Sequence, residues 1–388
     1  MCIMASCLSP NWSVFDIDQS QTLQVAVQEA HARSQPLAIR GGGSKTFYGR
    51  QTPACDLLDL GGHRGIIDYA PNELFITLRA GTSLQALEAQ LAEAGQMLPF
   101  EPPHFGPAAT IGGTLACGFS GPRRPYAGSA RDMVLGMRIL NGQGEILRFG
   151  GQVMKNVAGY DVSRLMVGAL GTLGVLLEVS LKVLPRPDST VTLVWPMDPV
   201  TAVQRMNDWA GQPLPLSSTA YDGEHLYIRL SGTGSAVRAA QTRLGGERLP
   251  DAEAAAFWVA LREQRNDFFQ GDAPLWRLAV APAPPPCRSG IRPLSNGAAV
   301  NAGCVVPLMR LPCGSWQRST VVTPPCFVVE IAVARSFIPS HHRCWRYNNG
   351  SKRPSIRAAS SIRAVFTPPS EVCPCKPISP PASKMIPA

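Results

Sequence analysis

Residues 37–45 read LAIRGGGSK, an apolar run that passes directly into three glycines and a serine. The apolar residues predict a short strand. The glycines after it can adopt positive φ angles, which turn successive backbone N–H groups toward one anion. Arg40 and Lys45 flank the glycines and favour a negatively charged ligand such as a diphosphate. The stretch matches neither the GxGxxG sequence of Rossmann folds nor the GxxxxGK[ST] phosphate loop, so it predicts neither NAD nor ATP.

Two further glycine-rich segments lie downstream. Residues 110–122 read TIGGTLACGFSGP, and a third segment runs from KNVAGYD at 155–161 to GTLG at 171–174. In residues 110–122, polar or glycine positions alternate with apolar ones, which suits a backbone that packs against a flat ligand. A single glycine run is more often a plain turn, but three such segments exceed what one turn-rich domain needs. Together they predict a cofactor site.

The rest of the chain up to residue 280 has the pattern of an α+β protein. Hydrophobic periodicity and capping signals predict helices at 21–33, 84–94, 200–209, 236–244 and 252–269. Strands are predicted at 37–39, 57–60, 74–78, 175–183, 191–195, 218–221, 226–230 and 276–280. A hairpin is predicted at 134–149, around Asn141 and Gly142. The Pro-Arg-Pro sequence at 185–187 predicts a linker between two α+β units.

The last part of the chain differs in composition from the rest. Residues 281–388 hold 13 of the 36 Lys+Arg, two of the 27 Asp+Glu and seven of the 11 cysteines. The preceding residues are mildly acidic, so the net charge of +9 gives no argument for nucleic acid as a partner of the body. This tail lacks helical or strand periodicity and any CxxC pair. A zinc or disulfide module, a basic nucleic-acid or membrane tail, and a translated wrong reading frame are the alternatives, and the composition favours the last.

The sequence contains few features that indicate the cellular compartment, and most of the evidence is the lack of a targeting segment. The sequence has no apolar stretch of about 18 residues and no basic, apolar leader at its start, so neither a membrane span nor a signal peptide is expected. The spacing of the four cysteines before residue 281 does not suggest disulfide bonds, which favours a location in the reducing cytoplasm. Taken together, these features predict a cytoplasmic protein.

The order of motifs resembles a known family of flavoproteins. Residues 40–44, 102–104, 110–113, 118–123, 131–132, 155–161 and 171–175 look like the FAD-binding domain of the vanillyl-alcohol-oxidase/PCMH superfamily. Within it, GPRRP at 121–125 and VMKNVAGYD at 153–161 are most similar to the FAD-binding subunits of glycolate oxidase. The resemblance implies an N-terminal extension at 1–19 and a PCMH-type FAD-binding domain of two α+β subdomains at 20–187. An incomplete α+β cap domain at 188–280 and the tail at 281–388 would follow.

The resemblance also implies how FAD is held. Backbone N–H groups of the first glycine segment would bind the pyrophosphate. The second segment would line the flavin and ribityl side, and the last glycine of the third would lie near the adenine or flavin edge. The implied cofactor-binding residues are Arg40, Gly41, Gly42, Gly43, Ser44, Thr110, Gly112, Gly113, Gly118, Ser120, Gly121, Gly174 and Val175.

Several single residues have both a functional and a structural interpretation. His104 could anchor flavin covalently, but histidine-linked members of the superfamily carry that residue in the first loop, and residues 41–46 have none. We therefore expect non-covalent FAD and a hydrogen-bonding loop histidine at 104. Cys117 could be a flavinylation or redox cysteine, although a small buried thiol is the expected state. Lys155 and Tyr160 are candidates to face the flavin.

The charged residues near the second segment do not identify the catalytic residue or the anion that is bound. Arg123, Arg124 and Arg131 could bind a phosphate or a substrate carboxylate, or could pair with Asp132. No convincing general base occurs before residue 281, so the catalytic residue is not assigned. The sequence has no HxH or HExxH motif, so no catalytic metal is expected.

A test of the reading frame is possible from the protein sequence alone. Members of the glycolate oxidase flavin-subunit family carry an acidic residue, Trp-Gly-Gly and then Arg-Trp in the cap domain, and the motif is absent here. Generic codons for residues 295–303, read from the last base of the codon for Leu294, permit Val-Glu-Trp-Gly-Gly-x-Gln-Arg-Trp. This predicts a frameshift between residues 280 and 294, and an unrelated, disordered tail. The coding nucleotides decide the point, because an intact frame would contradict it.

The function implied by the resemblance is the oxidation of glycolate, a small 2-hydroxy acid, by an FAD-dependent oxidoreductase acting on CH–OH groups. The implied partners are a second FAD-binding glycolate oxidase subunit and an iron–sulfur subunit, in a complex peripheral to the inner face of the membrane. The chain itself has no iron–sulfur cysteine pattern. Three alternatives stay open: a non-catalytic FAD-binding scaffold, a related oxidoreductase for lactate or a sugar lactone, and a non-functional product that lacks its complete cap.

Overall fold

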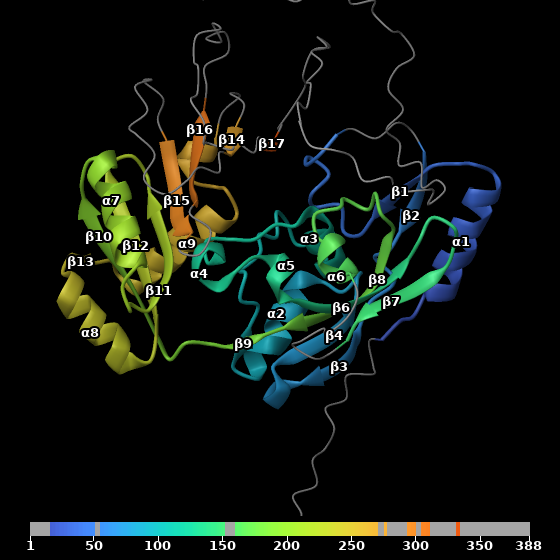
Figure 1. Ribbon diagram of the computed structural model, residues 1–388, viewed down its shortest axis with the longest axis horizontal. Helices are drawn as coiled ribbons and strands as arrows, with labels where there is room; N and C mark the ends of the chain where they lie inside the picture. Colours follow the sequence, from blue (N-terminus) through green and yellow to red (C-terminus); the bar gives the residue numbers. More distant parts are fainter. Residues whose placement is uncertain are drawn as a thin grey trace, which may run out of the picture.

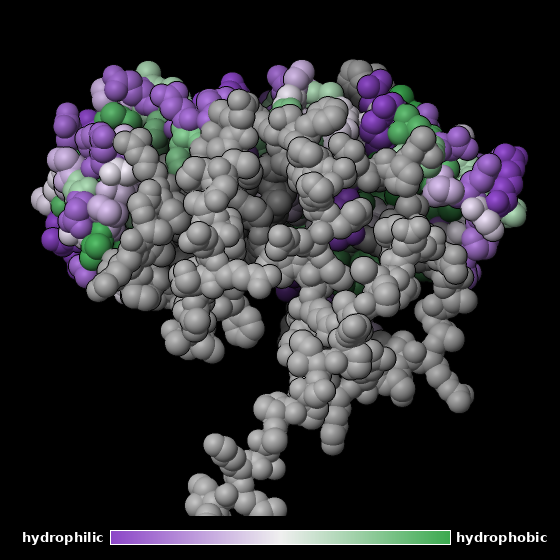
Figure 2. Space-filling model, turned by 90° about the horizontal axis from the view of Figure 1, so that it is seen from above, coloured by the Kyte–Doolittle hydropathy of each residue, from purple (hydrophilic) through white to green (hydrophobic). Residues whose placement is uncertain are grey.

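The computed structural model describes residues 16–50, 55–151 and 160–270, with four further strands at 275–277, 293–299, 304–310 and 331–333. These residues form two lobes that lie side by side (Figure 1). The first lobe contains two subdomains with one continuous apolar core, and the second is built on a separate sheet. Hydrophilic residues predominate on the visible ends of both lobes, with apolar residues interspersed (Figure 2).

The first subdomain contains the strand that precedes the glycine loop. Leu23 and Val27, one turn apart on the first helix, pack with Leu58 and Leu60 into the core of the first lobe. The elements are helix α1 (Ser20–Ala32) and the parallel strands β1 (Leu37–Arg40) and β2 (Asp56–Asp59). The predicted helix at 21–33 and the strands at 37–39 and 57–60 are therefore confirmed within one or two residues.

The second subdomain is a five-stranded antiparallel sheet with short helices. The strand order is β3-β4-β8-β6-β7. The strands are β3 (Ile66–Ala70), β4 (Phe75–Arg79), β6 (Val134–Leu140), β7 (Ile146–Gly150) and β8 (Val175–Lys182), and β5 (Gln96–Met97) pairs separately with β9 (Leu184–Pro185). The helices are η2 (Pro71–Glu73), α2 (Leu84–Glu93), α3 (Ile111–Cys117), α4 (Arg124–Ala127), α5 (Ala130–Met133) and α6 (Val162–Leu165).

Local sequence signals explain several of these elements. Ser83 caps α2 by accepting a hydrogen bond from the backbone N–H of Ala86, as its position before an apolar helix predicts. The predicted hairpin around Asn141 and Gly142 forms between β6 and β7. The Asn141 side chain accepts hydrogen bonds from the N–H groups of Gln143 and Glu145, which stabilises the turn.

Strand β8 is the main departure from the predicted pattern. Its alternation of Val or Leu with Glu178, Ser180 and Lys182 predicts a half-buried strand, but every residue except Lys182 is buried. The polar residues are buried because they have partners: Ser180 shares a hydrogen bond with Thr77, and Glu178 pairs with Arg79 and Arg138. Alternation alone therefore predicted the wrong exposure for this strand, since buried polar groups are tolerated when they are paired.

The second lobe carries an eight-stranded sheet, in the order β13-β10-β12-β11-β15-β16-β14-β17. Its strands are β10 (Ser189–Pro196), β11 (Leu216–Tyr221), β12 (His225–Gly232), β13 (Glu247–Arg248), β14 (Leu275–Arg277), β15 (Pro293–Ala299), β16 (Cys304–Arg310) and β17 (Ile331–Val333). The helices are α7 (Pro199–Ala210), α8 (Gly234–Leu244), α9 (Asp251–Arg262) and η3 (Asp267–Phe269). The predicted helix at 252–269 ends at Arg262, and this earlier end positions the residues that follow it.

Three of these strands belong to residues 281–388, for which the sequence predicts no regular structure. Strand β15 pairs with β11 of the second lobe, and β16 pairs with β14 and β15. Most of the tail, including six of its seven cysteines, lies outside the described residues. The frameshift stays a prediction, because backbone pairing of short strands does not identify the reading frame.

Candidate functional site

The described parts of the three glycine-rich segments meet in the first lobe. A Cβ atom added to Gly41 would overlap Thr110 Oγ1, and one on Gly42 would overlap the carbonyl oxygen of Ala108, so the first glycine segment packs against the start of the second. The N–H of Gly168 donates to the carbonyl of Leu115 at 2.9 Å, and a Cβ on Gly171 would lie 3.1 Å from Ile39. The described parts of the three glycine-rich segments, which are far apart in the sequence, are therefore in contact in the fold. Residues 152–159, with the candidate Lys155, lie outside the described residues.

The loop after β1 offers unused hydrogen-bond donors. Among the described residues, the backbone N–H groups of Gly42, Gly43 and Ser44 have no acceptor. Gly43 has a φ of +69°, the left-handed conformation that permits the tight turn. Three neighbouring free N–H groups on a close-packed glycine loop suit the oxygens of a diphosphate. The residues present therefore fit the pyrophosphate of FAD.

Arg40, which begins this loop, has a partner inside the protein. Its Nη2 lies 3.0 Å from the Oδ2 of Asp59, and both side chains are about half exposed. The sequence predicts Arg40 as a residue that flanks the anion. In the structure its charge is already offset by Asp59, so the glycine loop rather than the guanidinium offers the free donors.

The backbone N–H groups at the start of the second glycine segment are hydrogen-bonded within the protein, so they are not free to bind a ligand. Thr110 caps helix α3, and its Oγ1 accepts a hydrogen bond from the N–H of Gly113 at 3.2 Å. The N–H groups of Ile111 and Gly112 donate to the carbonyls of Thr82 and Ala80. These groups are therefore satisfied within the protein. Sequence reasoning did not predict a helix here, because two glycines in seven residues disfavour one.

The remaining predicted cofactor residues also have internal roles. Gly118 ends α3 with a φ of +67°, and Ser120 Oγ accepts a hydrogen bond from the N–H of Ala130. The N–H of Gly121 donates to the carbonyl of Phe100. Gly174, at φ +142°, lies against the end of β6, and the side chain of Val175 is buried in the core. The contacts of these last two residues are with β6 rather than with the glycine loop.

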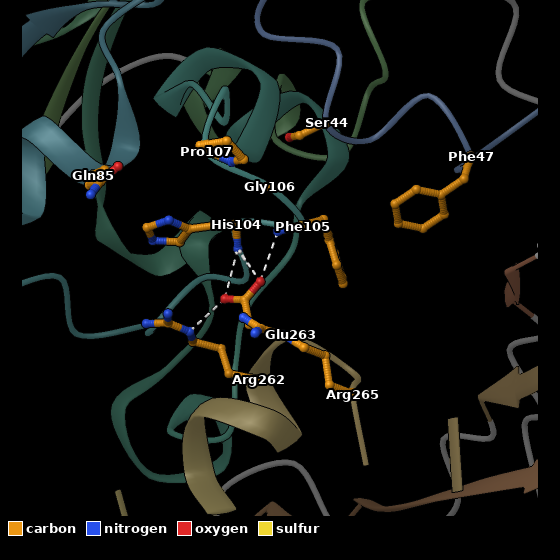
Figure 3. A pocket seen from close by; sticks show the side chains of 10 residues that line it. All are labelled: Ser44, Phe47, Gln85, His104, Phe105, Gly106, Pro107, Arg262, Glu263 and Arg265. Carbon is orange, nitrogen blue, oxygen red and sulfur yellow. Dashed lines mark hydrogen bonds and ion pairs between the residues drawn. The ribbon is translucent and has the colours of Figure 1, made fainter. Parts of the chain in front are cut away.

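A cavity of about 640 Å³ opens between the two lobes beside the glycine loop. Its volume lies in the range of small-molecule and cofactor sites, roughly 300–1,000 Å³. The lining residues come from four separate segments of the chain (Figure 3): Ser44, Phe47, Gln85, His104, Phe105, Gly106, Pro107, Arg262, Glu263 and Arg265. The loop with the free donors thus forms one wall of the cavity, and the end of α9 forms another.

Glu263 connects the two lobes across this cavity. It follows α9 directly, is 4% exposed, and accepts hydrogen bonds from the backbone N–H groups of His104 and Phe105 and from Arg262 Nε (Figure 3). Burial acts to raise the pKa of this carboxyl, but the two backbone hydrogen bonds, together with the charges of Arg262 and His104, outweigh it, and the pKa lies below its ordinary value. Sequence reasoning missed Glu263, because its partners lie about 158 residues away in the chain.

Lys45 is a buried cation beside the glycine loop. Its side chain donates to the carbonyl of His104 at 3.1 Å and to Ser44 Oγ at 3.2 Å. The residue is 8% exposed, and no carboxylate among the described residues forms an ion pair with it. Burial lowers the pKa of Lys45, while Cys117 and Glu263 act in the opposite direction. A buried cation without an ion-pair partner is costly, and an anionic ligand would offset that cost.

The other single residues follow the structural interpretation. His104 Nε2 lies 3.0 Å from Glu88 Oε2, as expected for a hydrogen-bonding loop histidine. Cys117 is half-buried rather than buried, and burial raises the pKa of its thiol to about 11, so it is a thiol at neutral pH. The Tyr160 side chain is almost fully exposed. Asp132 accepts hydrogen bonds from Ser129 in a capping box and has no ion pair with an arginine among the described residues.

Among the described residues, no three His, Cys, Asp or Glu side chains are grouped so that they could hold a metal ion. In the same part of the chain, no helix combines the length and apolar character needed to cross a membrane.

Comparison with known proteins relates the chain to flavoproteins. A family model described as an FAD binding domain matches residues 14–150. The chain is 51% identical to glycolate oxidase subunit GlcE of Escherichia coli over 265 residues, which are 68% of this chain and 74% of that protein. It is 32% identical to glycolate oxidase subunit GlcD of Bacillus subtilis over 160 residues, 41% of this chain and 34% of that protein. With a D-lactate dehydrogenase of Anaerostipes hadrus it shares 33% identity over 133 residues, 34% of this chain and 28% of that enzyme.

Solved structures share the fold at low sequence identity. p-Cresol methylhydroxylase superposes with a TM-score of 0.60 at 16% identity, covering 76% of this chain and 73% of that one. Alkyldihydroxyacetonephosphate synthase gives a TM-score of 0.57 at 17% identity, covering 74% of this chain and 69% of that one. These similarities confirm the predicted α+β fold of the PCMH type, and at this level of identity they show the fold alone.

Proposed function

Because the chain belongs to the GlcE family of glycolate oxidase subunits, we propose that it is the FAD-binding subunit of a complex that oxidises glycolate to glyoxylate. Membership of this family confirms the resemblance that the glycine-rich motifs predict, and it makes the chain an FAD-dependent oxidoreductase subunit. The observation that carries the proposal is the 51% identity over 74% of a glycolate oxidase subunit. The glycine loop with its three free N–H groups supports FAD as the cofactor.

The chain's own residues suit the binding and positioning of FAD. We propose that the N–H groups of Gly42, Gly43 and Ser44 donate to its pyrophosphate and that Lys45 supplies the opposite charge. Helix α3 and the turn at 118–121 would shape the wall against which the flavin and ribityl groups pack. The resemblance also implies Gly174 near the adenine or flavin edge, but its close contacts are with the end of β6. When bound there, FAD would supply the hydride acceptor that the oxidation of a 2-hydroxy acid requires.

The partners follow from the names of the relatives. Glycolate oxidase has more than one kind of subunit, since GlcE and GlcD are both named as its subunits. We therefore propose that this chain acts in a multi-subunit complex with a second FAD-binding subunit. An iron–sulfur subunit and a peripheral position at the inner face of the membrane extend the same proposal.

A non-catalytic FAD-binding scaffold is the second candidate, and the cavity gives a reason to keep it. Its two titratable groups suited to proton transfer are both engaged: Glu263 accepts three N–H donors, and His104 pairs with Glu88. The carboxylate of Glu263 is therefore occupied, and no other carboxylate lines the described part of the cavity. Turnover of the complex reconstituted with and without FAD in this subunit separates the candidates, since unchanged turnover would favour the scaffold.

The first prediction concerns the cofactor itself. The purified full-length chain should show the visible absorption bands of an oxidised flavin, and denaturation followed by filtration should release all of the flavin into the filtrate. Release is expected because Cys117 is held as a thiol, His104 pairs with Glu88, and the glycine loop carries no histidine. Folded protein without flavin would contradict the proposal, and flavin that stays with the protein would contradict non-covalent binding.

The second prediction concerns Lys45. Lys45→Met should weaken FAD binding about tenfold, because one charge-assisted interaction is lost. The thermal stability of the flavin-free protein should be unchanged or higher, since the substitution removes a buried cation that lacks an ion-pair partner. Fluorescence titration and thermal unfolding measure the two effects. Lys182→Met, on the last residue of β8, is the matched control, and equal FAD affinity in both variants would disprove the role of Lys45.

A further inference from the structure

A second set of charged side chains lies where the two lobes meet, next to the cavity. Arg229 of β12 forms a two-pronged ion pair with Glu101 of the first lobe, with Nη1 to Oε1 at 2.9 Å and Nη2 to Oε2 at 2.6 Å. Arg229 is 6% exposed, and its guanidinium also donates to Ser217 Oγ and Ser218 Oγ. Both members of this pair are therefore fully engaged with protein partners.

Arg123 lies two residues after Gly121, which packs against the backbone of Glu101, and its side chain has no partner among the described residues. It precedes α4, which packs against β11 of the cap sheet (Figure 1). The residue is half-buried, and its guanidinium forms no hydrogen bond or ion pair with any described residue. Burial lowers the pKa of Arg123, the like charge of Arg229 lowers it further, and Glu101 acts in the opposite direction. An arginine in such a place is stabilised by an anion, and the described part of the chain does not supply one.

Arg262 reaches the same loop from the cap side. A Cβ atom on Gly121 would lie 3.4 Å from the Cγ of Arg262. Arg262 Nε donates to Glu263, but its two terminal nitrogens have no acceptor among the described residues. Arg265, three residues on, also lines the cavity and has no side-chain partner in the described chain. Figure 3 shows both arginines on the cap side of the cavity, below the segment of His104 and Phe105.

The charges at this junction do not balance. Among the described residues the arginines here are Arg123, Arg229, Arg262 and Arg265, and the carboxylates in contact with them or with the adjoining loop are Glu101 and Glu263, which leaves an excess of two positive charges in this part of the chain. The carboxylates are already engaged, Glu101 with Arg229 and Glu263 with three N–H donors. The unused donors are guanidinium N–H groups, whose planar fork matches a carboxylate. Of these arginines, Arg262 and Arg265 line the cavity, and the glycine loop with its own free donors contributes Ser44 to another wall of it.

We propose that the junction between the lobes is the site for the carboxylate of the 2-hydroxy acid substrate, with Arg123 and Arg262 as its hydrogen-bond donors. This rests on the proposed function for the class of substrate, and it adds the residues that recognise it. The carboxylate is the only formal charge of a small 2-hydroxy acid, so the arginines would fix the end of the molecule that does not react. Because the donors come from both lobes, the acid would also hold the cap against the FAD-binding domain.

The test uses oxalate, an unreactive dicarboxylate of similar size, and isothermal titration calorimetry on the full-length, FAD-loaded chain. The variants are Arg123→Gln and, as matched control, Arg124→Gln, which removes the same charge from the neighbouring exposed residue. Arg123→Gln should bind oxalate about 10- to 100-fold more weakly, because hydrogen bonds to a charged partner are lost. Arg124→Gln should stay within about twofold of the wild type, and the FAD affinity of both variants should match the wild type.

The other possible results of the titration also support or overturn the proposed carboxylate site. Oxalate that fails to bind the FAD-loaded wild type, or that binds Arg123→Gln normally, overturns the inference and leaves FAD binding intact. Loss of FAD from Arg123→Gln would mean that Arg123 contacts the cofactor, which also overturns it. If the wild type holds no FAD, the proposed function fails, and titration of the flavin-free chain still decides the arginine site. If Arg123→Gln does not fold, Arg123→Lys and Arg265→Gln decide: oxalate affinity several-fold below the wild type supports the site, and wild-type affinity in both overturns it.

Discussion

Substitution of Gly42 by alanine should abolish FAD binding at micromolar concentrations of cofactor. The added Cβ would overlap the carbonyl oxygen of Ala108 and lie 3.2 Å from the Cβ of the same residue. Neither atom belongs to a flexible side chain, so the loop after β1 must move away from the segment before α3. Such overpacking costs about 1–3 kcal/mol and displaces the backbone. The free N–H groups of Gly42, Gly43 and Ser44 would then no longer converge on one anion.

Fluorescence titration with FAD measures this effect, and circular dichroism shows whether the variant is folded. Gly211→Ala is the matched control, because Gly211 has an ordinary helical φ of −79° and an added Cβ would come no closer than 3.7 Å to another atom. The control should bind FAD like the wild type. Wild-type affinity in Gly42→Ala would contradict the assignment of the loop to the pyrophosphate.

The parts of this molecule that sequence could predict are those with local determinants. The strand and glycine loop at 37–45 are an example, since an apolar run followed by glycines determines both the strand and its turn. The hairpin between β6 and β7 is another, because Asn141 makes its own turn hydrogen bonds. The three glycine-rich segments, which the sequence predicts to form one cofactor site, have their described parts in contact in the first lobe.

The parts that sequence could not predict depend on distant partners. Glu263 and Arg262 are ordinary residues at the end of a helix until the fold brings residues 101–105 against them. Burial of Glu178 in β8 depends on arginines from two other strands. Arg123 was a candidate for a carboxylate or an ion pair, and only the absence of a partner among the described residues favours the carboxylate. The hydrophobic periodicity of a segment predicts which of its own residues are exposed. Ion pairs and hydrogen bonds between different helices and strands determine which charged side chains have no partner.

Glu263→Gln should lower the free energy of unfolding by about 3 kcal/mol at pH 7, because it removes the buried charge that two backbone N–H groups and Arg262 Nε contact. It should also weaken FAD binding, since the cavity wall at His104 and Phe105 is held by this carboxylate. Urea unfolding of the flavin-free protein and fluorescence titration with FAD measure the two effects. Glu253→Gln, on the exposed first turn of α9, is the control and should change stability by less than about 1 kcal/mol.

The pH dependence of stability separates the charge of Glu263 from a mere packing defect. In the unfolded chain a glutamic acid takes up its proton near its ordinary pKa of 4.5, and in the folded protein the pKa of Glu263 is lower. Its stabilisation is therefore fully present above about pH 4.5 and is lost as the pH falls from there through the folded pKa, because only the unfolded chain then binds the proton. The wild type should lose more stability between pH 7 and pH 4 than Glu263→Gln does, and the two curves should converge at the acid end. Parallel curves would mean that the Glu263 carboxylate makes no charge-dependent bond between the lobes, and that other contacts, such as the Glu101–Arg229 pair and the Tyr126–Thr219 hydrogen bond, position the second lobe.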